Sequence, residues 1–161
     1  MLPPPQKKSG FSAEKQNTVM QEMRRQREPA QPMDVLEILE KTHGSREQAI
    51  KTYNGLADLV INDKDFRVMR ANNTLFAYNN NRNGSVDILM ETVDSPRDLI
   101  DSIKQFCDAM KIAGFKFGSF DIDNPQIVKA IKMSGKNVSI KSSGGVMQDG
   151  KTPQMIGTVE F

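Results

Sequence analysis

Residues 120–140, "FDIDNPQIVKAIKMSGKNVSI", have the pattern strand, turn, helix, turn and strand. Asp123 or Asn124 suits the N-cap of the helix, and Pro125 suits its first turn, where a missing N–H costs nothing. Apolar residues recur at helical spacing after this proline, and Gly135 favours the end of the helix. The segment predicts an α+β fold. It leaves open whether the helix belongs to an enzyme or to a protein that keeps an enzyme's frame without its chemistry.

The residues before this segment also alternate between helical and strand-like patterns. Residues 33–44 and the residues from Ser45 onward have apolar side chains at helical spacing, and Gln48 stands three residues after Ser45, as in a capping box. Gly55 is expected to bend or end the second helix. Asn-rich turns, including Asn83-Gly84, then separate three short strands that form an antiparallel meander. The predicted strands are 66–70, 74–78 and 85–92.

A helix, a strand and a final hairpin are predicted around the opening segment. Asp94 or Ser95 caps a helix that Gly114 ends, and its apolar stripe includes Cys107. The strand "FKFGSFDI" follows, and a change of phase at Gly118 predicts a bulge. Strands over 137–140 and 154–161 are joined by "KSSGGVMQDGKTP". The Gly pair in that loop could cradle a phosphate, but no strand and helix flank it, which favours a flexible hairpin loop.

The composition excludes several kinds of site. The 161 residues carry a net charge of +2 and contain one cysteine and one histidine. Cys107 alone forms no disulfide or Cys-type zinc site, and a lone His43 forms no His–His metal pair, so no metal is predicted. Cys107 is expected in the core, and His43 is expected to act at a helix end, where its charge is mildly favourable. No apolar run is long enough to span a membrane, and the N-terminus lacks the apolar stretch of a signal peptide.

Residues 1–32 differ from the body in composition and are predicted to form an extended, partly helical arm, with the domain at 33–161. The prolines near the start favour an extended chain, and the apolar stripe in residues 12–28 is too narrow for an independent helix. A disordered tail is the alternative for the isolated chain. The arm is predicted to bind a partner, and its basic residues to meet an acidic neighbour or packaged DNA. The predicted contact residues are Leu2, Pro3, Pro4, Pro5, Lys7, Lys8, Phe11, Val19, Met20, Met23, Arg24, Arg25 and Arg27.

The order of elements over residues 33–161 resembles the GCN5-related N-acetyltransferase (GNAT) fold. The most specific local match is "NPQIVKAIKMSG", in which Asn124, Pro125 and Gly135 stand at the family's usual interval before a strand. The resemblance implies a mixed sheet with helices on both faces. In this sheet an antiparallel meander is followed by a strand–helix–strand unit and a C-terminal hairpin.

Two functional motifs of that family are missing. Its members bind the diphosphate of coenzyme A in a glycine-containing turn, whereas the corresponding run "ETVDSPRDLIDS" has no glycine. Pro96 lacks an N–H, and Asp94 and Asp98 bring negative charge that Arg97 does not offset. The family's proton-donating tyrosine corresponds to Ile131, which donates no proton. Glu91 is considered as a general base but is expected to be structural or surface-exposed.

These absences predict a non-catalytic protein without a cofactor or catalytic residues. The chain is similar to acetyltransferase-like virion proteins of tailed bacteriophages, which implies a minor structural component of the head, neck or tail. Such a protein would be made in the host cytoplasm and assembled in several copies with other virion proteins. Two alternatives stay open: an active N-acyltransferase with a divergent acetyl-CoA loop, and a small regulatory adaptor that binds a host protein through residues 12–28.

Overall fold

The computed structural model describes residues 33–161, which contain four helices and six strands. The predicted arm lies outside the described residues, and the division of the chain at residue 32 stays a prediction. The helices and strands are α2 (Val35–His43), α3 (Arg46–Asn62), β1 (Phe66–Ala71), β2 (Thr74–Asn80), β3 (Ser85–Thr92), α4 (Pro96–Ile112), β4 (Phe117–Asp121), α5 (Pro125–Met133), β5 (Asn137–Val146) and β6 (Pro153–Glu160).

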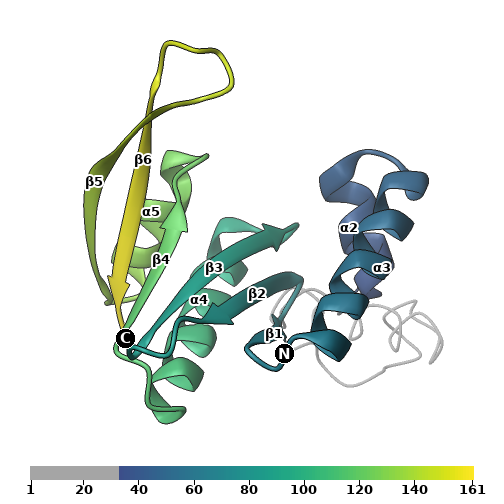
Figure 1. Ribbon diagram of the computed structural model, residues 1–161, viewed down its shortest axis with the longest axis horizontal. Coiled ribbons are helices and arrows are strands. Elements are labelled where there is room, and N and C mark those ends of the chain that lie inside the picture. Colours follow the sequence, from purple (N-terminus) through teal and green to yellow (C-terminus); the bar gives the residue numbers. More distant parts are fainter. Residues whose placement is uncertain (1–32) are drawn as a thin grey trace, which may run out of the picture. The chain divides into compact units, whose positions relative to one another are not determined.

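The six strands form one mixed sheet in the order β1-β2-β3-β4-β6-β5. All neighbours are antiparallel except β3 and β4, which run parallel and are connected through α4. A parallel pair requires a crossover connection, and α4 supplies it. Figure 1 shows the two parallel strands starting side by side and separating along their length. The predicted fold class is therefore confirmed.

Each face of the sheet has its own apolar cluster. On one face, Phe76, Val86 and Val159 pack with side chains of α4 and α5, including Phe106. Figure 1 shows these two helices behind the sheet. On the other face, Leu75 packs with buried residues of α2 and α3. Because successive side chains of a strand point to opposite faces, Leu75 and Phe76 of β2 enter different clusters.

The turn and capping signals are confirmed where the sequence is most specific. The Ser45 hydroxyl accepts a hydrogen bond from the Gln48 N–H at 3.2 Å, and Asn124 caps α5 in the same way. Gly44 and Gly135 follow α2 and α5 with positive φ angles of 79° and 87°, a backbone conformation that glycine adopts without strain. These local interactions mark the end of α2, the start of α3 and both ends of α5.

Three local predictions are wrong. Gly118 forms no bulge, because β4 keeps a continuous register with β3 and β6. A Cβ at this position would lie 2.5 Å from Cδ1 of Ile88, so the glycine allows close packing. Helix α3 continues through Gly55 to Asn62, so it does not end at this glycine, and a bend there stays a prediction. Finally, β5 extends to Val146 with a register shift, so the Gly pair predicted in a loop belongs to a strand.

The described part of the chain contains no helix that is both long and apolar enough to cross a membrane. Within residues 33–161, no three His, Cys, Asp or Glu side chains are grouped so that they could hold a metal ion.

Candidate functional site

The parallel strands β3 and β4 form a fork in the middle of the sheet. They pair over three residues, and the last pair is Asp87 with Ser119. Beyond this pair, β3 continues to Thr92 along β2, whereas β4 continues to Asp121 along β6. The sheet therefore opens between them (Figure 1).

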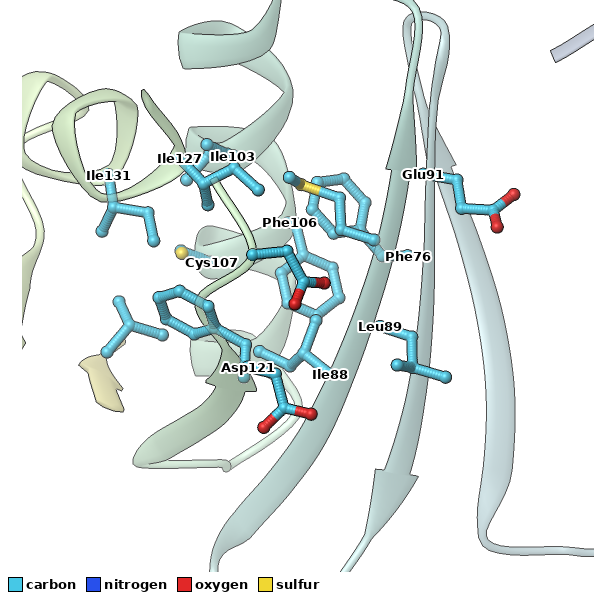
Figure 2. Close-up of a pocket in the computed structure, with 14 residues that line it drawn as sticks. Phe76, Ile88, Leu89, Glu91, Ile103, Phe106, Cys107, Asp121, Ile127 and Ile131 are labelled. Carbon is cyan, nitrogen blue, oxygen red and sulfur yellow. The ribbon is translucent and has the colours of Figure 1, made fainter. Parts of the chain in front are cut away.

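A cavity of about 280 Å³ lies in this fork on the side of α4 and α5. Apolar side chains dominate its wall, and Figure 2 shows Ile103, Phe106 and Cys107 of α4 together with Ile127 and Ile131 of α5. An apolar cavity with few polar groups suits the neutral, flexible part of a small-molecule ligand. Its lining also includes the acidic residues Glu91, Asp121 and Asp123, so the wall does not favour an anion.

A second hollow, of about 370 Å³, is lined by residues from the opposite face of the sheet. Its lining includes Asp87 and Ser119, and it shares Asp121 with the first cavity. Leu89 and Phe120 belong to the lining of both hollows, so the two meet at the fork. Two ligands could therefore approach the same point from opposite faces. The carboxylates on the second side favour a cation.

Glu91 of β3 is held at this fork by the end of α2. Its Oε1 lies 2.7 Å from Nε2 of His43, and its Oε2 accepts a hydrogen bond from the Thr42 hydroxyl at 3.1 Å. Both side chains of the Glu91–His43 pair are about 31% exposed, so protons can exchange with solvent. Figure 2 shows the Glu91 carboxylate pointing away from the apolar cavity. Glu91 belongs to the lining of the first cavity, and by strand alternation its side chain lies on the same face of β3 as Leu89, which lines both hollows. This position suits a base where the two hollows meet.

The backbone of β3 directs polar groups into the fork. The Val93 N–H donates to the Asn73 carbonyl at 3.2 Å, on the side of β2. Because N–H groups alternate in direction along a strand, those of Met90 and Thr92 point toward β4. Pairing with β4 has already stopped at this level. The Met90 N–H is therefore placed to donate to an oxygen of a ligand in the fork.

Asp94 has a structural role at the start of α4. Its carboxylate accepts hydrogen bonds from the Asn73 N–H at 2.9 Å, the Thr74 hydroxyl at 2.5 Å and the Ser102 hydroxyl at 2.8 Å. Thr74 and Ser102 are fully buried. This network joins the β1–β2 turn to α4, which explains an acidic residue where the family's pattern favours a phosphate-binding turn.

The residues singled out inside the cavity are inert. Ile131 is buried and contributes an apolar wall, so it offers no proton. Cys107 is buried, which confirms the prediction of a core residue. Burial raises the pKa of its thiol to about 11, so the side chain stays protonated and neutral at physiological pH.

The sequence did not reveal that His43 and Glu91 are in contact. His43 does end α2, but it also binds Glu91, which lies 48 residues further along the chain. No local pattern indicates such a contact, and neither residue was predicted to be catalytic. The predicted partner-binding residues, between positions 2 and 27, lie outside the described part of the chain.

No family model matches the sequence, and no curated protein matches it either. Solved structures do match. The microcin self-immunity acetyltransferase MccE, in complex with acetyl-CoA and AMP, has a TM-score of 0.55 at 8% identity, covering 73% of this chain and 72% of its own. YncA of Salmonella typhimurium, described as an acetyltransferase with its cofactor acetyl-CoA, has a TM-score of 0.54 at 9% identity, covering 80% and 90%.

A third structure names the family. It is a protein from Chromobacterium violaceum assigned to the GNAT family of acetyltransferases, with a TM-score of 0.53 at 12% identity, covering 81% of this chain and 85% of its own. These neighbours contradict the prediction of a non-catalytic structural protein located in a bacteriophage particle. The missing glycine turn and tyrosine had led to that prediction, whereas the overall fold matches that of acetyltransferases. The described chain has the GNAT fold.

Proposed function

We propose that this protein is an N-acyltransferase that moves an acyl group from a thioester to an amine at the fork between β3 and β4. The observation that carries the proposal is the meeting of two different hollows at one point. The apolar cavity suits a thioester arm, and the hollow with Asp87 and Asp121 suits a cationic amine. The acetyltransferases that share the fold, two of them solved with acetyl-CoA, support this choice.

The chemical step needs one base and one hydrogen-bond donor from the chain. Glu91 accepts a proton from the ammonium group of the acceptor, and His43, at 2.7 Å, helps to pass that proton to solvent. The amine lone pair attacks the thioester carbonyl carbon, while the Met90 N–H donates to the carbonyl oxygen as it becomes negative. The C–N bond forms, the C–S bond breaks, and the sulfur leaves with the bonding electrons.

The leaving thiolate does not require a protein acid. A free thiol has a pKa of about 8.5, so its thiolate is a good leaving group near neutral pH. It takes the second proton that the nitrogen loses on becoming an amide. The products are one amide and one thiol, and the proton released from the ammonium goes to solvent. The isoleucine at position 131 is therefore compatible with turnover.

The test is a transfer assay with acetyl thioesters and a panel of primary amines that includes a polyamine and a basic peptide. Mass spectrometry detects the acetylated amine, and a thiol reagent detects the released thiol. Cys107 is the sole cysteine of the chain and is buried, so it contributes little background. We expect Glu91→Gln to lower kcat by roughly 10²–10⁴-fold, the usual contribution of a general base.

Two further variants sharpen the assignment. Glu47→Gln removes an exposed carboxylate of α3 and is expected to keep full activity. His43→Asn is expected to lower kcat less than Glu91→Gln does, because His43 acts through Glu91. Unchanged transfer by Glu91→Gln would remove Glu91 from the mechanism. A folded wild-type protein that acylates no amine from any thioester would contradict the proposed function.

A further inference from the structure

The turn between β3 and α4 uses its own N–H groups internally. Within residues 93–99, the N–H of Val93 donates to Asn73, that of Asp94 donates to the Thr92 hydroxyl at 3.0 Å, and that of Asp98 donates to the Ser95 hydroxyl at 3.3 Å. The N–H of Leu99 begins the helical ladder, donating to the Ser95 carbonyl at 2.8 Å.

Few donors are left for a phosphate at this turn. Pro96, the first residue of α4, has no N–H at all. In this part of the described chain, the N–H groups of Ser95 and Arg97 remain. Helix N-termini bind phosphate through several N–H groups that point at the ligand together. A side chain at every position from 91 to 101 also keeps the main chain from approaching a ligand as closely as a glycine turn does.

The charge at this end of α4 opposes an anion. The Asp94 carboxylate is held here by three hydrogen bonds, so rotating it away from this end of the helix would break all three. Asp98 lies in the first turn, and Asp101 follows within hydrogen-bond reach of Asn72 at 3.2 Å. Arg97 is the basic residue of this turn. The carboxylates therefore repel the two charges of a diphosphate.

The cavity beside this turn has the opposite character. Its wall is mostly apolar, although Glu91, Asp121 and Asp123 also belong to the lining. Because N–H groups alternate along β3, those of Met90 and Thr92 point toward β4. A pantetheine arm is neutral and carries amide groups that pair with the open backbone of a strand. Within residues 33–161, the fork therefore has a place for the arm of a thioester, whereas the turn between β3 and α4 does not suit the diphosphate of a nucleotide.

We propose that the acyl donor is a pantetheine thioester that is not attached to a nucleotide diphosphate. The inference rests on the proposed transferase function and specifies its donor. Two sources share this chemistry: phosphopantetheine bound to a carrier protein, and a free pantetheine thioester. Either enters the fork without placing a diphosphate against Asp94 and Asp98.

The test compares kcat/KM for acetyl-CoA, acetyl-pantetheine and an acetylated phosphopantetheinyl carrier protein, with the full-length chain and one amine acceptor. A site that grips the nucleotide by two charged hydrogen bonds would favour acetyl-CoA over acetyl-pantetheine by about 100-fold or more. We expect the ratio to stay below about tenfold, the equivalent of about 1.4 kcal/mol. A carrier protein that exceeds acetyl-pantetheine identifies the carrier-bound source, and equal rates identify the free thioester.

A preference for acetyl-CoA of tenfold or more would overturn the inference while leaving the transferase function intact. Absence of transfer from every donor would instead count against the function itself. A matched pair of variants gives a second test. Pro96→Ala restores an N–H at the start of α4 and should raise the relative use of acetyl-CoA. Pro125→Ala does the same at the start of α5 and should not. An equal response of both variants would contradict the inference.

Discussion

Gly118 allows close packing where β3 and β4 are still paired. It lies in the last stretch where β3 and β4 pair, and its neighbours occupy the space that a Cβ would need. Such a Cβ would lie 2.5 Å from Cδ1 of Ile88 and 2.6 Å from Cζ of Phe161. The glycine therefore lets side chains of β3 and of the C-terminus pack directly on the backbone of β4.

We predict that Gly118→Ala destabilises the protein, because the added methyl group forces Ile88 or Phe161 out of place. Overpacking of this kind costs about 1–3 kcal/mol in the free energy of unfolding, which urea denaturation measures. Gly145→Ala is the matched control. Its Cβ would lie no closer than 3.5 Å to a neighbouring atom, and its φ is not positive. Equal stability of both variants would show that Gly118 is not tightly packed.

Individual residues also mark the limit of sequence reasoning at this scale. The change of phase at Gly118 was visible, but a bulge and a close contact give the same local pattern. Only the neighbours in space, 30 and 43 positions away, decide between them. Similarly, the sequence placed His43 at a helix end but could not bring it to Glu91. Pairwise contacts between distant residues depend on the assembled fold.

At the scale of elements, the Asp94 network attaches α4 to the β1–β2 turn. Three donors converge on one carboxylate, and two of them, the hydroxyls of Thr74 and Ser102, are fully buried. The same helix, α4, also contributes Ile103, Phe106 and Cys107 to the wall of the apolar cavity. Asp94, whose charge disfavours a phosphate at this turn, thus also helps to hold α4 in place.

We predict that Asp94→Asn weakens this attachment, because the neutral amide offers one acceptor oxygen where the carboxylate offers two, and hydrogen bonds to a charged group are stronger. The free energy of unfolding should fall by about 1–3 kcal/mol in urea denaturation. Asp58→Asn, at an exposed position of α3, should change it by less than about 0.5 kcal/mol. If Asp94→Asn were as stable as the control variant, the hydrogen bonds to Asp94 would contribute nothing to the free energy of unfolding.

Most elements could be predicted because their ends are marked locally. The capping residues Ser45 and Asn124 and the glycines after the helices act within one turn of the chain, so they are legible in the sequence. The end of β5 was not, because its extension to Val146 depends on pairing with β6. Strand length is decided by the partner strand, and the glycines at 144 and 145 indicated a loop.

At the scale of the molecule, function is set by the separation of β3 from β4 and by the helices on each side. The glycine turn and the tyrosine are missing, and both were treated as essential for catalysis. The sequence therefore predicted a non-catalytic protein. Under the proposed function, the cavity holds the thioester arm, the second hollow holds the acceptor, and Glu91 lies where the two meet. The lack of a diphosphate-binding turn then supports the proposal that the acyl donor is a pantetheine thioester without a nucleotide diphosphate.

The most direct measurement of this account is a crystal structure of the full-length chain with a stable acetonyl thioether of pantetheine, in which a CH₂ separates sulfur from the carbonyl. We predict that the arm lies between β3 and β4 against Ile127 and Phe106, with its carbonyl oxygen at the Met90 N–H and its carbonyl carbon open toward Glu91. An arm bound elsewhere, or a fork that stays empty at saturating ligand, would contradict the account.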